Sequence, residues 1–240
     1  RHIVVYFLIW YLTININLMS QSRRNFLAYL ALGTTASAFP LLKEIEKLDI
    51  DFPEDSEQLN SALSWVDQVK GSKKIVYDGS SFNKGFPIHW NWAFYASNNG
   101  FKVPDSEITA VTVLRSMGIA PAFNSALWDK YKFGEFFKVN DPKTGKPSLR
   151  NFVDRPEKGD LPAGGTNGIS DMLERNAMFC VCDAATRIIS GILAKRMGLD
   201  TKEVYQDFAD NVIDGIQPVP TGVWALGEVQ AKGCGYIFAG

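Results

Sequence analysis

The sequence predicts an α/β fold with a mostly parallel sheet, helices on both faces and a single domain. Short apolar, β-branched runs alternate with segments of helical spacing from residue 73 onward, as in chains built from βαβ units. The 240 residues are 46% hydrophobic, which is enough for one sizeable core. Because neither a shift in composition nor an internal repeat divides this region, we expect one domain.

Five segments are predicted as strands: 73–79, 108–115, 177–182, 215–220 and 236–238. The first stops at Asp-Gly-Ser-Ser, and the second is rich in β-branched residues. The third is a short apolar run that ends in a thiol and leads directly into a helix, and we expect it to be the central strand. The fourth is weakened by Pro218 and Pro220.

Two helices are predicted before the first strand, over 41–50 and 56–69. In the second, Leu59, Leu63, Val66 and Val69 recur on one face, and we expect both helices to pack on the outside of the domain. Later helices are predicted over 86–99, 120–131, 169–175, 184–197, 201–208 and 222–232, with Thr201 and Thr221 capping the last two.

A long loop is predicted over 139–168. It contains nine prolines and glycines, a density of breakers that excludes regular elements. Loops of about 30 residues are uncommon in compact domains unless they have a use. We therefore expect a lid, a binding loop or an oligomer contact.

The N-terminal region carries the pattern of a twin-arginine export signal. Adjacent arginines, a polar residue and Phe-Leu open an apolar run in the motif Ser22-Arg23-Arg24-Asn25-Phe26-Leu27, and an A-x-A cleavage site follows at 36–38. An ordinary amphipathic helix is the alternative. We expect a signal peptide over 19–38 and a periplasmic protein.

Residues 1–18 are apolar and resemble a membrane span. However, Met19 lies just upstream of the twin arginines, so we expect 1–18 to be an upstream, non-native segment. A helical segment over 39–72 and the α/β domain over 73–240 then follow. Contact with a membrane is expected only through an uncleaved signal segment.

Composition narrows the classes of partner and cofactor. Residues 1–38 hold three arginines and no acid, so the remainder has 22 basic against 26 acidic residues, a net charge of −4. A mildly acidic body without a basic stripe argues against nucleic acid. Three cysteines are too few for a disulfide scaffold. His89 is the only histidine after the signal segment, which excludes a multi-histidine metal site, and no C-x-x-C-H haem attachment is present.

Cys182 is the candidate reactive thiol. It ends the third strand beside the start of a helix, where the helix dipole stabilises a thiolate and the neighbouring Asp183 opposes it. Packing of the thiol in the core is the alternative. Cys180 lies in mid-strand, where a small buried hydrophobe is expected.

Further polar residues are expected at the carboxyl edge of the sheet, where open α/β sheets bind ligands. Asp78, Ser80, Arg115 and Thr221 are candidate ligand-binding residues, although a salt-bridged strand end is an alternative for Arg115. His89 and Asp183 are candidate acid–base partners of Cys182. For His89, packing among aromatic rings or capping of a helix is the alternative.

The region from residue 73 onward resembles the DsrE-like (YchN-type, sulfur-relay) family. Three stretches carry the resemblance: the strand and helix of 111–128, the strand 177–182 that ends in cysteine, and the C-terminal runs 219–224 and 230–237. The resemblance implies a Rossmann-like domain that assembles into trimers or hexamers. It also implies that the cysteine matching Cys182 accepts sulfur as a persulfide in some members.

The export signal and the long loop distinguish this chain from the relay members, so we expect it to be closer to an exported DsrE-like branch. The leading hypothesis is a homo-oligomeric binding or assembly protein that holds a small molecule at the carboxyl edge. The alternative is a sulfur acceptor that uses Cys182. The sequence identifies no cofactor and no metal ligand set.

Overall fold

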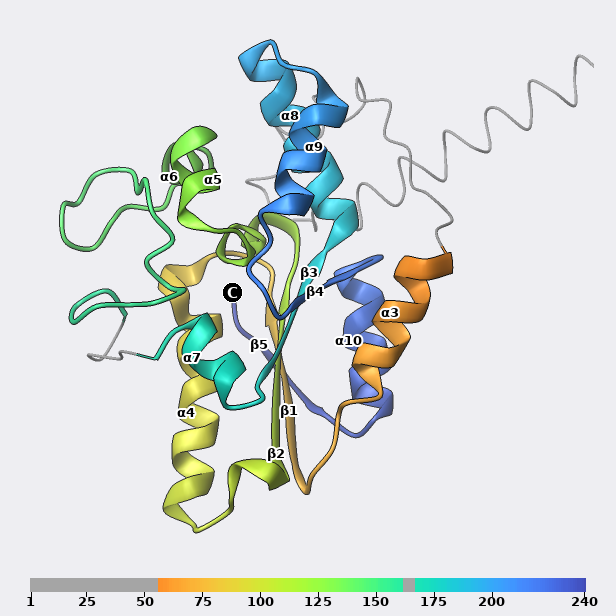
Figure 1. Cartoon of the computed structure of the whole chain (residues 1–240). Helices are drawn as coiled ribbons and strands as arrows, with labels where there is room; N and C mark the ends of the chain where they lie inside the picture. The colour runs from red at the N-terminus through yellow and green to blue at the C-terminus, as the bar shows by residue number, and fades with distance from the viewer. Residues whose placement is uncertain (1–55, 162–166) are drawn as a thin grey trace, which may run out of the picture.

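The structure, a computed structural model, describes residues 56–161 and 167–240. The chain forms a five-stranded, all-parallel sheet with helices on both faces, so the predicted single-domain, Rossmann-like α/β fold is confirmed (Figure 1). The predicted segments 1–18 and 19–38 and the helix predicted at 41–50 lie outside the described residues. None of the described helices has both the length and the apolar character needed to cross a bilayer.

The strands lie in the order β4-β3-β2-β1-β5. Their bounds are β1 Lys73–Gly79, β2 Ile108–Leu114, β3 Met178–Cys182, β4 Ile216–Val219 and β5 Gly235–Phe238. All residues of β2 and β3 are buried, as expected for parallel strands covered on both faces. The prediction that 177–182 is central was wrong: β2 is central, because β5 pairs with the far side of β1.

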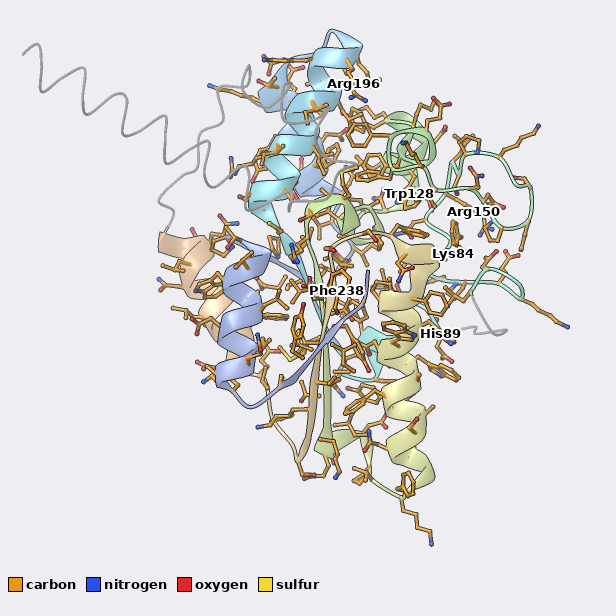
Figure 2. The ribbon with its side chains drawn as sticks, turned by 180° about the vertical axis from the view of Figure 1, so that it is seen from behind. Lys84, His89, Trp128, Arg150, Arg196 and Phe238 are labelled. Carbon is orange, nitrogen blue, oxygen red and sulfur yellow. The ribbon has the colours of Figure 1, made fainter. Side chains whose placement is uncertain are left out.

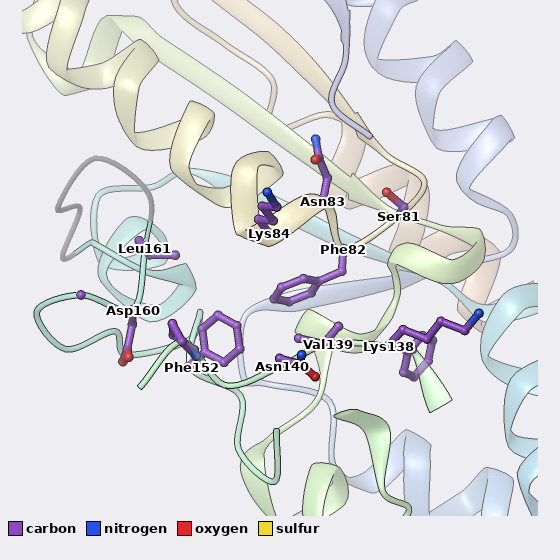
Figure 3. Close-up of a pocket in the computed structure, with 13 residues that line it drawn as sticks. Ser81, Phe82, Asn83, Lys84, Lys138, Val139, Asn140, Phe152, Asp160 and Leu161 are labelled. Atoms are coloured by element: carbon purple, nitrogen blue, oxygen red, sulfur yellow. The ribbon is translucent and has the colours of Figure 1, made fainter. Parts of the chain in front are cut away.

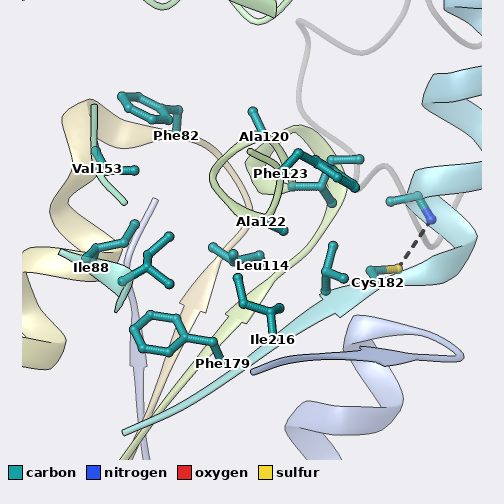
Figure 4. Close-up of a cluster of buried hydrophobic side chains, with 14 of the residues drawn as sticks. Phe82, Ile88, Leu114, Ala120, Ala122, Phe123, Val153, Phe179, Cys182 and Ile216 are labelled. Carbon is teal, nitrogen blue, oxygen red and sulfur yellow. Dashed lines mark hydrogen bonds between the residues drawn. The ribbon is translucent and has the colours of Figure 1, made fainter. Parts of the chain in front are cut away.

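One face of the sheet is covered by α4 (Phe86–Gly100) and α7 (Ile169–Glu174) (Figure 1). The larger hydrophobic core lies on this face and is continued by α5 (Ser125–Lys130), α6 (Phe133–Phe136), α8 (Asp183–Met197) and α9 (Thr201–Asp210). Figure 4 shows side chains from distant segments meeting there, among them Ile88, Leu114, Phe123, Val153 and Phe179. The long loop thus contributes to the core.

The opposite face is covered by α3 (Ser56–Val66) and α10 (Gly222–Ala231), which lie together in Figure 1. The prediction of the apolar face of α3 was partly wrong. Ala62, Trp65 and Val66 are buried against the sheet, whereas Leu59 and Leu63 are more than 40% exposed. The helix carries two adjoining apolar stripes, and the inner one packs in the same cluster as Ala225 and Val229 of α10.

Two predicted helix details differ in the structure. The helix predicted over 120–131 is broken into a short 3₁₀ turn, Ala120–Ala122, and α5, because Phe123 is extended and bridges Val212, and Asn124 caps α5. The cap of α9 is Asp200 rather than Thr201. Thr221 caps α10 as predicted, through a hydrogen bond from the Trp224 N–H.

The predicted loop contains no helix or strand over its described residues 139–161. It is nevertheless well packed. A bridge joins Asn140 to Pro147, and Phe152, Val153 and Leu161 are buried in the larger core. The segment therefore forms a fixed wall beside the N-terminal end of α4.

Candidate functional site

The carboxyl edge of the sheet has a topological switch point between β1 and β5. The chain leaves β1 for β2 through α4 on one face, and it reaches β5 from β4 through α10 on the other face. Open α/β sheets bind ligands in the crevice at such a point. The predicted site residues do follow the strands here. Asp78, Arg115 and Cys182 interact electrostatically, whereas Ser80, Asp183 and His89 have other partners.

Asp78 and Arg115 form a buried ion pair. The guanidinium donates from Nε and Nη2 to the two carboxylate oxygens at 2.6 and 2.9 Å, and the Tyr236 hydroxyl donates to Asp78 Oδ2 at 2.8 Å. Burial alone would lower the pKa of Arg115, but hydrogen bonding to Asp78 and the charge of that carboxylate raise it overall. Arg115 is therefore salt-bridged, which is the alternative considered for it above.

Cys182 lies between the N-terminal ends of α8 and α10. Its Sγ accepts a hydrogen bond from the Ala185 N–H at 3.4 Å (Figure 4). The Gly222 N–H also donates to it. Burial raises the pKa of the thiol, although the two N–H donors and the charge of Arg115 act in the opposite direction. Only 1% of the residue is exposed, so in this conformation the thiol is protonated and out of reach of a second macromolecule.

Asp183 and Ser80 have partners other than Cys182. Asp183 accepts from Arg187 Nε and from the Tyr205 hydroxyl, both at 2.7 Å. The Ser80 hydroxyl and N–H both donate to the oxygen of Gly240. These two residues stabilise the ends of α8 and of the chain.

His89 lies on α4, on the side of the molecule that holds Lys84 and Arg150, whereas α3 and α10 lie on the opposite side (Figure 2). Its ring centroid is 5.1 Å from that of Trp92 and 6.3 Å from that of Phe86. Burial lowers the pKa of the imidazole, and Nδ1 is buried without a hydrogen-bond partner among the described residues. Within that part of the chain no hydrogen bond or ring contact joins His89 to Cys182 or Arg115.

A cavity of about 650 Å³ lies beside the carboxyl end of β1, and we call it the loop pocket (Figure 3). It is bounded by 81–84 after β1 and by three parts of the loop region: 137–140 with Pro142, Phe152, and 159–161. None of the predicted site residues lines it, although Ser81 follows the predicted Ser80 directly.

The loop pocket has an apolar floor and a polar rim. Phe82, Val139, Phe152 and Leu161 are buried, and the rings of Phe82 and Phe152 meet edge to face with centroids 5.4 Å apart. Four polar lining residues are exposed at the rim: Asn83, Lys84, Lys138 and Asn140. Such a combination can hold the apolar part of a molecule and orient its polar end.

Arg150 fixes the wall of the pocket. It donates from Nη1 and Nη2 to both oxygens of Asp160 at 2.9 and 2.8 Å, and from Nε to Asp141 at 2.7 Å. Its guanidinium also lies 5.7 Å from the ring centroid of Phe152. Asp160, which lines the pocket, is thus neutralised by Arg150. In the described ranges 56–161 and 167–240, no group of three His, Cys, Asp or Glu side chains is placed to hold a metal ion.

Comparison with protein families and with curated proteins finds no match. Among solved structures, a protein of unknown function from Methanobacterium thermoautotrophicum is similar, with 18% identity and a TM-score of 0.29. The similarity covers 70% of this chain and 99% of that one.

Proposed function

We propose that this chain is an exported DsrE-like protein that binds a small molecule in the loop pocket. The observation that carries the proposal is the cavity itself, with its buried aromatic floor and polar rim. Its volume falls within the range of about 300–1,000 Å³ that is typical of small-molecule sites. Its wall is fixed by the Arg150 ion pairs, so the cavity is formed before a ligand arrives.

The test is native mass spectrometry of the protein isolated from the periplasm of its own host. We expect a bound mass that is lost when the protein is denatured. Asn140→Trp, which places a large ring at the pocket rim, should abolish that mass, whereas Lys146→Trp, outside the pocket lining, should retain it. Bare protein in the wild type would contradict the proposal.

Export is part of the proposal and rests on the twin-arginine motif. Replacement of Arg23 and Arg24 by lysine keeps the charge but removes the motif, and the protein should then accumulate in the cytoplasm. Fractionation followed by immunoblotting measures this. Equal periplasmic amounts of variant and wild type would contradict the prediction.

Assembly into a trimer or hexamer is the remaining part of the proposal. It is supported by the edge strand β5, where Tyr236, Ile237 and Phe238 are 41–58% exposed. This is an unusual concentration of apolar surface on a strand edge that pairs with none of the described segments. Light scattering after size-exclusion chromatography should give a mass several times that of the chain, and Phe238→Lys should reduce it. A monomeric wild type would contradict assembly without affecting ligand binding.

A second candidate function, transfer of sulfur by Cys182, is favoured by the two backbone N–H groups that donate to its Sγ. In this reaction the Cys182 thiolate attacks the outer sulfur of a persulfide donor, the donor S–S bond breaks, and the donor thiolate leaves. Intact mass after incubation with a small persulfide should increase by one sulfur in Cys180→Ser but not in Cys182→Ser. Because the thiol is buried, the reaction also requires the ends of α8 and α10 to separate.

A further inference from the structure

We infer that the molecule bound in the loop pocket is an organic anion, in which a carboxylate, sulfonate or phosphate group is attached to an apolar body. This inference rests on the proposed binding function and specifies the class of ligand. Three features of the pocket support it: the charge of its rim, the backbone beside Lys84, and the aromatic floor.

The charge of the rim is positive. Lys84 and Lys138 line the pocket, are exposed, and have no ion pair or hydrogen bond within the described part of the chain. The acidic residue of the lining, Asp160, has a fully buried carboxylate paired with Arg150. Figure 3 shows Lys84 beside the start of α4, whereas the Lys138 side chain extends outward on the other side of the pocket. The rim thus carries positive charge without a competing free carboxylate, and an anion is the complementary ligand.

The backbone beside Lys84 adds to this positive potential. Asn83, Lys84 and Gly85 have successive φ values of 37°, 54° and 80°, a left-handed run that is costly for the two residues with side chains. The run ends at the first turn of α4, a 15-residue helix whose N-cap, Gly85, provides no side-chain acceptor. The dipole of this helix thus begins next to the lining residue Lys84. Because the Phe86 N–H is bonded to the Asn83 oxygen and Pro87 has no N–H, neither position offers a free N–H group to a ligand.

The apolar floor of the pocket indicates that the ligand has an apolar part as well as a charged group. Phe82 and Phe152 present ring edges and faces to the cavity, with Val139 and Leu161 beside them (Figure 3). A bare inorganic anion would leave this surface in contact with water. A ligand with a planar or aliphatic body covers the floor while its anionic group lies at the rim beside Lys84 and the start of α4.

The test uses two fluorescent probes with the same aryl body. Anilinonaphthalene sulfonate carries a sulfonate, and N-phenyl-1-naphthylamine lacks it. Both should bind the full-length mature protein, and Asn140→Trp should weaken both if they occupy the loop pocket. In the Lys84→Gln/Lys138→Gln double variant, the Kd of the sulfonate should rise about tenfold, whereas that of the amine should change by less than about twofold.

Lys102→Gln/Lys146→Gln is the matched control, because these exposed lysines do not line the pocket and their loss removes the same charge. It should leave both affinities unchanged. If both probes bind and the Lys84/Lys138 double variant affects them equally, the anion inference is overturned and the binding proposal stands. If neither probe binds in an Asn140→Trp-sensitive way and the native protein carries no ligand, both are overturned.

Discussion

Asp78 is the most consequential single residue at the carboxyl edge. Its carboxylate is 3% exposed and accepts from Arg115 and Tyr236, so its loss leaves a guanidinium that is only 16% exposed without its partner. Asp78→Ala should lower the free energy of unfolding by about 3 kcal/mol. Urea denaturation measures this.

The matched control is Asp129→Ala, since the Asp129–Lys132 pair is more than half exposed on both sides. It should cost less than about 1 kcal/mol. Equal losses in the two variants would show that burial does not determine the strength of the Asp78–Arg115 pair.

His89 should make stability depend on pH on the acid side. Burial lowers its pKa in the folded protein below the ordinary value of 6.5, so the unfolded chain binds the proton first as the pH falls. Its contribution is therefore complete above pH 6.5 and is lost as the pH falls below that value. His89→Phe, which keeps an aromatic ring beside Trp92, should flatten the unfolding midpoint across this range. An unchanged pH profile would exclude this role for the imidazole.

The N-terminal cap of α9 is Asp200 in the structure, whereas the sequence predicted Thr201. The Asp200 carboxylate accepts from the N–H groups of Lys202 and Glu203 at 2.9 and 3.0 Å. Asp200→Ala should therefore cost about 1 kcal/mol, whereas Thr201→Ala should have an effect within a few tenths of 1 kcal/mol. Thermal denaturation of the two variants distinguishes the caps, and a larger loss from Thr201→Ala would favour the cap predicted from the sequence.

The loop 139–161 should loosen in acid. Burial alone would raise the pKa of Asp160, but hydrogen bonds from Arg150 and the Glu157 N–H lower it overall below the ordinary value of 3.8. The ion pair therefore contributes fully above pH 3.8, and its contribution falls as the pH drops below that value. Backbone amide hydrogen–deuterium exchange, measured with brief labelling at each pH, should show that protection of the loop decreases across this range while β2 stays protected.

Arg150→Ala should release the loop already at neutral pH. Arg155→Ala is the control, because the Arg155–Glu174 pair is about two-thirds exposed on each side. It should leave loop protection unchanged. Persistent protection in Arg150→Ala would mean that Phe152 and Leu161 alone hold the loop.

The individual elements were largely predictable, because β-branched runs and helical spacing are local properties. The bounds of β1 and the cap at Thr221 agree with the structure for that reason. The buried face of α3 and the break at Phe123 were not predictable, since each depends on a partner distant in the sequence. The order of the strands also depends on pairing between segments distant in the sequence, which is why β3 was wrongly predicted to be central.

The arrangement of the candidate site was only partly predictable from the sequence. The strand ends predicted that Asp78 and Arg115 lie at the carboxyl edge, where the structure joins them in an ion pair. The loop pocket was missed because its lining comes from stretches without any motif, brought together by the Arg150 ion pairs and the aromatic floor. The density of prolines and glycines in 139–168 was the single indication, and it predicted a use for the segment without identifying the residues.

The place of β5 has a consequence for synthesis of the protein. β5 pairs with β1, and the Tyr236 hydroxyl reaches Asp78 across 158 positions of sequence. On the ribosome, the outer edge of β1 therefore has no partner until residues 235–238 have emerged from the exit tunnel. Such long-range parallel pairing is slow and leaves an open strand edge that attracts other chains. The nascent protein is thus most prone to aggregation in the interval when β1 to β4 have emerged and β5 has not.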